Sequence, residues 1–314
     1  MLPVVNNYKP YKDKPKYQFT VCGPILYSVS DPNELVNMIE INMMFGAHHF
    51  IFYDDSVSGK ALEYLKKYQN EGLVDIITWK LPPGVKTHYR GQAFSVIDCH
   101  YRNMYISKYI AYFDADEVIV PKSFSNWSQI LSNVLKINGP NLCAAVLWNV
   151  FYRADLKQPQ VLNGSDDKTA KKYNIKPLSV TIRDNIVTVP GHTKWIGDPL
   201  HMTLGSVHYP QICYRNATKH HVNEAEGLMF HYRIRPYYNK PTMQDTFMLR
   251  HKEEILKQVV ARHKKFQPLQ QTSTTTSNQT TSQTLSHSQS ASHQTSTTKS
   301  PNNRNTTFDA NVHP

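Results

Sequence analysis

Three carboxylates follow an apolar run near the middle of the chain. Asp114, Asp116 and Glu117 come after Tyr109–Phe113, and the apolar run Val118–Val120 follows them. Asp114 and Asp116 are two residues apart, so on extended backbone both side chains face the same side. Like charges this close are costly unless a cation or a proton lies between them. The pattern indicates an Asp-x-Asp site in which a divalent metal bridges carboxylates to a diphosphate. The alternative is a solvated acidic turn, and the apolar flanks on both sides favour the metal.

A second acidic group occurs earlier in the chain. Asp54, Asp55 and Ser56 follow the strand-like run His49–Tyr53. Asp54 or Asp55 would contact a nucleotide. The alternative, a simple turn in which Asp55 or Ser56 caps the next helix, stays open.

Strand-like and helix-like segments alternate around these acids. Strands are expected at 17–29, 49–53, 74–79 and 109–113, and helices at 31–46, 62–72 and 94–107. This order predicts an α/β fold with an open, mostly parallel sheet and helices on both faces. Ligands of such sheets bind at the carboxyl ends of strands, where both acidic groups fall.

Local signals add detail to this reading. Asp31 is expected to cap the first helix, with Pro32 in its first turn and Gly46 at its end. Further along, we expect a helix at 127–137, extended chain at 142–153, a polar loop at 155–176 and a helix at 244–265.

Length and composition divide the 314 residues into three parts. We expect an N-terminal extension at 1–16, one catalytic domain at 17–266 and a disordered tail at 267–314. The tail consists mostly of Ser, Thr, Gln, Asn and His, and it cannot bury enough apolar surface to offset its ordering entropy.

The basic charge of the chain bears on its partners. The formal net charge is +11, and the tail contributes +1 through Lys299, Arg304 and Asp309, which leaves +10 for the rest. Such a surface suits an anionic ligand such as a nucleotide diphosphate. The bases are scattered, with no Lys/Arg-rich run, so no nucleic-acid partner is expected.

Cysteines and sequons bear on the compartment. Cys22, Cys99, Cys143 and Cys213 fit neither a zinc nor a Cys-x-x-Cys spacing, so they form two disulfides or remain buried thiols. No apolar run approaches the ~18 residues of a membrane span, and the N-terminus is no signal peptide. The Asn-x-Ser/Thr sequons at Asn126, Asn163 and Asn216 give weak support for a secretory glycoprotein, whereas those at Asn278 and Asn305, in the polar tail, count for little.

The order of short motifs resembles glycosyltransferase family 92, whose members include nematode and plant galactosyltransferases. The resemblance covers about Tyr17 to Arg235. It rests on Cys22–Tyr27, Ile39–Asp54, Gly91–Asn103, Ala111–Pro121, Lys194–Ile196 and His231–Arg233. Each motif is weak alone, whereas six in the same order form a specific signal.

The resemblance implies a GT-A fold that binds a nucleotide sugar together with Mn²⁺ or Mg²⁺. It implies an inverting enzyme that transfers galactose from UDP-galactose to a glycan acceptor in a β1,4 link. It also implies a Golgi membrane protein, although the N-terminal anchor of the family is missing from this sequence. A catalytically silent, carbohydrate-binding relative is the alternative. A phosphoryl-transfer enzyme is a weaker one, because no Gly-rich phosphate loop is present.

For the metal, the resemblance assigns roles to the acidic cluster. Asp116 is the first choice of ligand, Asp114 would contact the ribose or the metal, and Glu117 would be a ligand or would orient one. Glycosyltransferases of this fold often complete the metal site with a downstream histidine. His231 is the first candidate for this ligand and His208 is the second. The alternative for each histidine is a purely structural role.

Further side chains are candidates for substrate contacts. Arg233 or Lys194 would pair with the diphosphate. The alternative for each is that it is an ordinary surface base. Arg102 would bind phosphate or pair within its helix. Trp195, expected to be exposed, and Trp148, expected in the core, are candidates to stack on a sugar.

An inverting transfer also needs a general base near the acceptor hydroxyl. The sequence does not identify it; weak candidates are Asp155, Asp198, Glu224 and Glu226.

Overall fold

The computed structural model describes residues 11, 14–185, 187, 192–234 and 240–267, and every structural statement below refers to these residues. Most of the expected N-terminal extension, and the tail from 268 onward, lie outside this described part.

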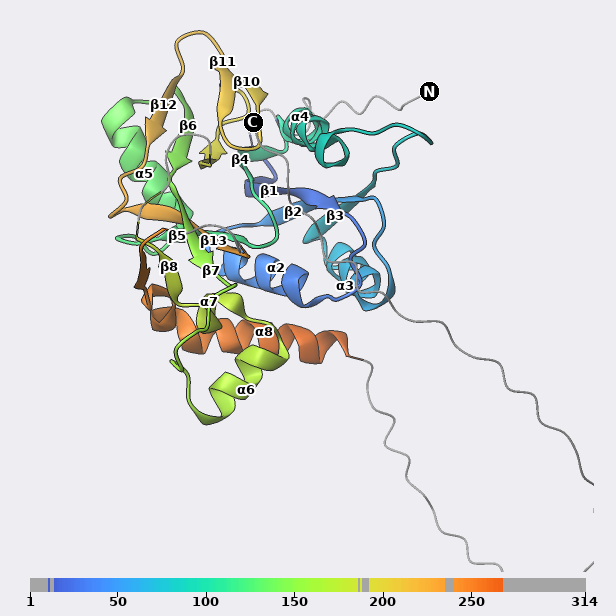
Figure 1. Ribbon diagram of the computed structural model, residues 1–314. Helices are drawn as coiled ribbons and strands as arrows, with labels where there is room; N and C mark the ends of the chain where they lie inside the picture. Colours follow the sequence, from blue (N-terminus) through green and yellow to red (C-terminus); the bar gives the residue numbers. More distant parts are fainter. Residues whose placement is uncertain (1–10, 12–13, 186, 188–191, 235–239, 268–314) are drawn as a thin grey trace, which may run out of the picture. The chain divides into compact units, whose positions relative to one another are not determined.

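A seven-stranded sheet forms the centre of the described chain (Figure 1). Its strands, in spatial order, are β12 (Thr218–His221), β6 (Leu142–Leu147), β9 (Lys194–Gly197), β4 (Ser107–Tyr112), β1 (Tyr17–Leu26), β2 (His49–Asp54) and β3 (Val74–Thr78). Strand β9 pairs antiparallel with both neighbours, and every other pairing is parallel. The predicted mostly parallel α/β sheet is therefore confirmed.

Helices cover both faces because side chains alternate along the strands. Phe19 and Phe50 pack into the larger hydrophobic cluster, whose helical members come mainly from four helices. These are α2 (Asn33–Phe45), α3 (Gly59–Asn70), α5 (Trp127–Asn138) and α8 (Lys252–Phe266). Cys22, Ile51 and Tyr53 point the other way, toward α4 (Gln92–Asn103). Figure 1 shows α4 on one side of β1–β3 and α2 and α3 on the other.

A five-stranded sheet packs beside the first. Its order is β14 (Thr242–Gln244), β8 (Ile182–Asp184), β7 (Asn149–Arg153), β13 (Gly227–Arg233) and β5 (Glu117–Pro121). Strand β13 runs parallel to β7 and antiparallel to β5. A hairpin of β10 (Met202–Gly205) and β11 (Pro210–Cys213) completes the strands of the described part. The chain thus leaves one sheet at Tyr112 and enters the other at Glu117, and the acidic cluster forms the crossing.

Three local expectations are wrong. The polar stretch 155–176 contains helix α6 (Gly164–Lys172), and α7 (Lys176–Ser179) follows. Ala170 is the buried residue of α6, so no apolar periodicity marked this helix. The helix expected from 244 begins at Lys252, after a 3₁₀ turn, η2 (Phe247–His251). Pro32, not Asp31, occupies the N-cap of α2, and the Asp31 carboxylate accepts a hydrogen bond from the Asn33 amide at 3.1 Å.

All four cysteines form disulfides. Cys22–Cys99 joins β1 to α4, and Cys143–Cys213 joins β6 to β11. This result decides between the two readings of the cysteines. Within the described residues, no helix is both long and apolar enough to cross a bilayer.

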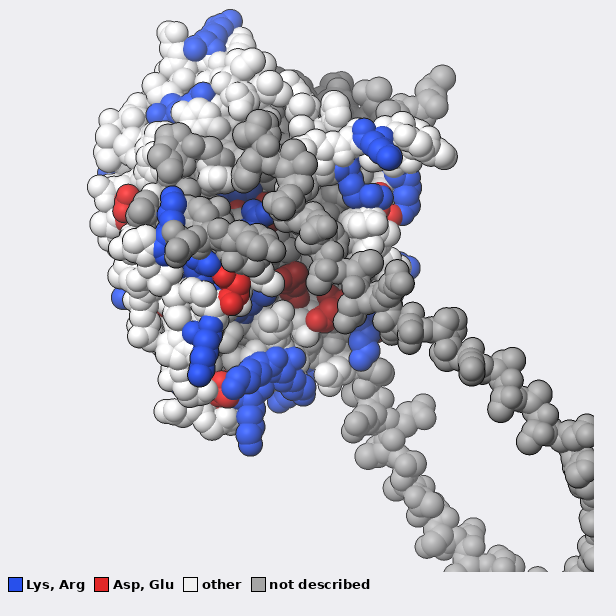
Figure 2. Space-filling model, viewed as in Figure 1, with Lys and Arg blue, Asp and Glu red and all other residues white. Residues whose placement is uncertain are grey.

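Charged side chains are dispersed over the visible face. Figure 2 shows Lys and Arg gathered most over α6, which carries Lys168, Lys171 and Lys172, and acidic side chains near the middle of this face. The visible face shows no continuous basic stripe of the kind that binds nucleic acid.

Candidate functional site

The acidic cluster is a turn at the carboxyl end of β4. The Glu117 amide donates to the Asp114 carbonyl at 3.1 Å, and the Asp114 amide donates to Oε2 of Glu117 at 2.7 Å. The side chains of Asp114 and Asp116 are each 28% exposed, whereas that of Glu117 is 1% exposed. Because the backbone turns here, Asp114 and Asp116 contact different side chains, Lys194 and His231.

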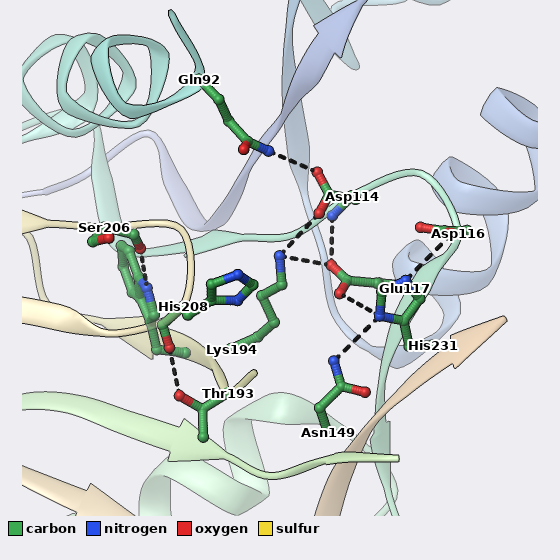
Figure 3. A network of polar contacts seen from close by, with 11 residues as sticks. Gln92, Asp114, Asp116, Glu117, Asn149, Thr193, Lys194, Ser206, His208 and His231 are labelled. Carbon is green, nitrogen blue, oxygen red and sulfur yellow. Dashed lines mark hydrogen bonds and ion pairs between the residues drawn. The ribbon is translucent and has the colours of Figure 1, made fainter. Parts of the chain in front are cut away.

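Lys194 holds Asp114 and Glu117 together from the neighbouring strand β9. Its Nζ lies 3.1 Å from Oδ2 of Asp114 and 2.9 Å from Oε2 of Glu117, and its side chain is fully buried (Figure 3). Burial alone would lower the pKa of Lys194, but the two negative charges raise it to about 12. Lys194 is therefore a buried cation paired with two acids, and the surface-base reading is wrong.

His231 links Asp116 to Glu117. Residue 231 pairs with 117 in the β13–β5 ladder, which places the imidazole between the two acids. Its Nε2 lies 3.3 Å from Oδ2 of Asp116, and its Nδ1 lies 3.1 Å from Oε1 of Glu117 (Figure 3). Asn149 approaches the same Nδ1 at 3.3 Å.

The charges of this group stabilise one another. Burial would lower the pKa of His231, but the negative charges of Glu117 and Asp116 outweigh burial and raise it. Burial would raise the pKa of Asp116, but the imidazolium of His231 outweighs burial and lowers it. Asp116 and His231 thus form an ion pair when no cation is bound.

The donor chemistry at Asp116 and His231 fits a divalent cation. In the described part of the chain, no three acids, histidines or cysteines converge in a ready-made metal cluster. However, a carboxylate oxygen and an imidazole nitrogen face each other here, and both are donors that Mn²⁺ accepts. The remaining positions of such a cation would fall to water and diphosphate oxygens. The other two expected ligands, Asp114 and Glu117, are engaged by Lys194.

His208, the second histidine candidate, lies beside Lys194 and not beside Asp116 (Figure 3). Burial and the nearby Lys194 charge lower its pKa. Its neutral ring therefore lies next to the buried cation.

The earlier acidic group lies at the same edge of the sheet. Oδ1 of Asp54 accepts a hydrogen bond from the Val57 amide at 2.9 Å, which closes a turn. Oδ2 of Asp55 lies 2.9 Å from Nη2 of Arg90, and the Arg90 guanidinium stacks 3.9 Å from the centre of the Tyr27 ring. The N-cap of α3 is Ser58, so neither Asp55 nor Ser56 caps that helix.

Sequence reasoning missed two residues that adjoin one motif, Gly91–Asn103. Arg90 has the positive φ of +56° in the turn η1 (His88–Gly91), and this turn carries its side chain to Asp55. Gln92 donates from Nε2 to Oδ1 of Asp114 at 3.2 Å. Arg90 directly precedes that motif and Gln92 lies inside it, and this position in the sequence could have indicated both as site residues.

The two arginine candidates differ in position. Arg233 is exposed at the end of β13, two residues after His231, so both side chains face the same side of that strand. Arg102 pairs with Asp98 at 2.9 Å within α4, which confirms the ion-pair reading.

The four candidate bases lie at different places in the fold. Asp198 pairs with Lys108 at 3.5 Å, near the amino end of β4. Asp155 pairs with Arg153 at 2.7 Å. Glu224 and Glu226 line an open pocket, and the β13 strand places Glu226 five residues, roughly 17 Å, from His231. A base must reach the acceptor hydroxyl within hydrogen-bond distance, and the choice among these four residues stays a prediction.

The tryptophans exchange their expected roles. Trp195 is fully buried in β9, and its Nε1 donates to the Ser206 carbonyl at 2.8 Å, so it offers no exposed sugar platform. Trp148 is only partly buried and lines the pocket of Glu224.

The model of glycosyltransferase family 92 matches residues 17–288. The chain is similar to β-1,4-galactosyltransferase galt-1 of Caenorhabditis elegans, with 32% identity over 115 residues, 35% of this chain and 27% of that protein. It is also similar to galactan β-1,4-galactosyltransferase GALS2 of Arabidopsis thaliana, with 26% identity over 119 residues, 37% of this chain and 23% of that protein. The matches span about a quarter of the length of these curated relatives.

Solved structures give only a distant likeness. Glucosyl-3-phosphoglycerate synthase of Mycobacterium tuberculosis aligns over 80% of each chain, with 10% identity and a TM-score of 0.31. TarS of S. aureus in complex with UDP aligns over 47% of this chain and 38% of its own, with 14% identity and a TM-score of 0.26. These scores are too low to support an argument about the site.

Proposed function

The chain belongs to glycosyltransferase family 92, and from this premise we propose that it transfers galactose from UDP-galactose to a glycan acceptor, with inversion and in a β1,4 link. The names of the relatives, which are β-1,4-galactosyltransferases, support the donor and the linkage. The observation that carries the proposal is the Asp116–His231 pair, backed by Glu117, at the carboxyl edge of the parallel sheet.

Asp116 and His231 would hold the cation. As UDP leaves, negative charge grows on its β-phosphate, and a bound Mn²⁺ or Mg²⁺ stabilises that charge as a Lewis acid. Oε1 of Glu117 lies 3.1 Å from Nδ1 of His231, and its negative charge would hold the ring with Nε2 facing Asp116. Glu117 is therefore the residue that orients the ligand, not a ligand itself.

Neighbouring side chains would bind the donor. Asp114, held by Gln92 and Lys194, would accept from the ribose hydroxyls. Arg233 follows His231 on the same side of β13, where its guanidinium would pair with the diphosphate. The Asp55–Arg90 pair lies at the same sheet edge and would contact the nucleoside.

Two features support a secretory-pathway location, for which we propose the Golgi. Both disulfides are of the kind that persists in oxidising compartments. The sequon asparagines Asn163 and Asn216 are exposed, whereas Asn126 uses its side chain to cap α5.

UDP release from a panel of UDP-sugars tests the proposal. With Mn²⁺ and without EDTA, we expect release from UDP-galactose above all other donors. Asp116→Asn removes the charge at nearly constant shape and should lower the rate by about 100-fold or more, as loss of one preorganised electrostatic contact does. Asp167→Asn, on the exposed face of α6, is the matched control and should behave like the wild type.

Two results would count against the proposal. Absence of release from every donor with either metal would favour the catalytically silent, carbohydrate-binding alternative. Full activity of Asp116→Asn would remove Asp116 from the metal site.

A further inference from the structure

An open pocket of about 850 Å³ lies around Trp148 and has no role in the chemistry above. Trp148, His220 and His221 supply its rings, and Asn223 and Glu224 supply exposed polar groups. Aromatic faces with a few polar groups are the usual lining of a site for a small organic ligand.

The rings of the pocket form a stacked row. The Trp148 indole lies over the His221 imidazole, with ring centres 4.7 Å apart and planes 29° apart. Tyr209, which is outside the pocket lining, packs on His221 with ring centres 6.0 Å apart and planes 27° apart. The faces of such rings are electron-rich and attract the C–H groups of a pyranose, while the polar groups at the rim bind its hydroxyls.

The pocket opens on the same edge of the sheet as the acidic turn. It lies at the carboxyl ends of β6 and β12, which run parallel to each other, and β6 runs in the direction of β4 because both pair antiparallel with β9. Neighbouring strands are about 4.8 Å apart, so β6 and β12 lie roughly 10 and 14 Å from β4.

Local contacts tie the pocket to the candidate metal site. Leu147 pairs with Lys194, and Trp148 follows directly. The next residue, Asn149, contacts His231. The pocket is therefore close enough for one extended ligand to reach both places, but too far for a single sugar to do so.

We propose that this pocket binds a sugar unit of the acceptor glycan remote from the unit that is glycosylated, with Trp148 as its stacking platform. The inference rests on the proposed function, and it adds a preference for oligosaccharide over monosaccharide acceptors.

Acceptors of increasing length test the pocket. The probes are β1,4-linked galacto-oligosaccharides, offered with UDP-galactose and Mn²⁺ to the full chain. For the wild type, KM should fall from the disaccharide to the longer members. In Trp148→Ala this length dependence should disappear, with an increase in KM of up to about tenfold for the longest member, the size of a lost aromatic contact. Trp148→Phe keeps an aromatic ring, so its length dependence of KM should be intermediate between those of the wild type and Trp148→Ala.

The controls separate this inference from the function on which it rests. Tyr101→Ala removes another exposed aromatic side chain, on α4, and should keep the length dependence of the wild type. UDP release from UDP-galactose without acceptor reports donor turnover alone, so its absence counts against the proposed function and not against the pocket.

Saturation-transfer NMR with the same oligosaccharides then tests the pocket without catalysis. Transfer to the wild type that is lost in Trp148→Ala would support the inference even in an inactive protein. No transfer to the wild type, or a length dependence that Trp148→Ala leaves intact, would overturn it.

Discussion

A single glutamate connects the two polar groups of the site. Glu117 accepts from the Asp114 amide, pairs with Lys194 through Oε2 and contacts His231 through Oε1. Removing one member of a buried charged group leaves the others uncompensated. The arrangement explains why an acid with 1% exposure is retained next to two more exposed ones.

Glu117→Gln should weaken metal use without removing a ligand. The amide keeps the shape but loses the charge that supports His231, and loss of such an orienting partner costs about 10- to 100-fold in metal affinity. The measurement is the Mn²⁺ concentration that gives half-maximal UDP release, together with Mn²⁺ binding followed by electron paramagnetic resonance. Glu63→Gln, an exposed acid on α3, is the control. An unchanged Mn²⁺ dependence would mean that Glu117 has only a structural role.

The acids and His231 were predicted from the sequence, but the side chains that hold them in place were not. Asp116 and His231 followed from the order of the motifs, and the structure brings them to 3.3 Å. Asn149 lies 82 residues from His231 in the chain, so only the pairing of β7 with β13 brings the two together. Trp195 was expected at the surface because Lys194 and Gly197 flank it, yet it lies in a strand enclosed by β4 and β6.

At the scale of elements, the alternation of strand-like and helix-like segments in the sequence predicted the mostly parallel sheet. Strands β1 to β4 and the helices between them are local patterns, each with its own apolar period. The separation of β4 from β5 was not predictable, because the apolar residues of β5 continue those of β4 in the sequence. The change of sheet depends on pairing with β13, more than 100 residues later.

His263, on helix α8, should make the free energy of unfolding depend on pH. The side chain is 3% exposed and stacks on Tyr173 at 4.3 Å. Burial lowers the pKa of His263 to about 4, whereas an unfolded chain has a value near 6.5. Below pH 6.5 the unfolded state therefore binds the proton first. The contribution of His263 is fully present above pH 6.5 and is lost as the pH falls toward 4.

Urea denaturation across this range measures the effect. Between pH 6.5 and 5, His263 should account for a loss of about 2 kcal/mol in the free energy of unfolding. His263→Phe keeps a ring against Tyr173 and should remove that part of the slope, whereas His88→Phe, at an exposed position, should not. Equal slopes for the wild type and His263→Phe would show that folding does not lower the pKa of His263.

At the scale of the described chain, the two disulfides connect two elements near the site, α4 and the β10–β11 hairpin, to the seven-stranded sheet. Cys22–Cys99 ties α4, which carries Gln92, to β1, and Cys143–Cys213 ties the β10–β11 hairpin to β6 beside the Trp148 pocket. The sequence allowed three pairings. Only the fold decides among them, because it brings strand and helix positions 77 and 70 residues apart into contact.

Reduction should therefore destabilise the protein strongly. Closing loops of 77 and 70 residues removes unfolded-state entropy worth roughly 4 kcal/mol for each disulfide in the chain-entropy model. Guanidinium denaturation with and without reductant should show a large shift in the midpoint for the wild type. Each variant that lacks one disulfide should retain part of this midpoint shift; the two are Cys22→Ala/Cys99→Ala and Cys143→Ala/Cys213→Ala. The variant without cysteines should show no shift. A wild type that is insensitive to reductant, with four titratable thiols after unfolding, would contradict both bonds and remove the main support for an oxidising compartment.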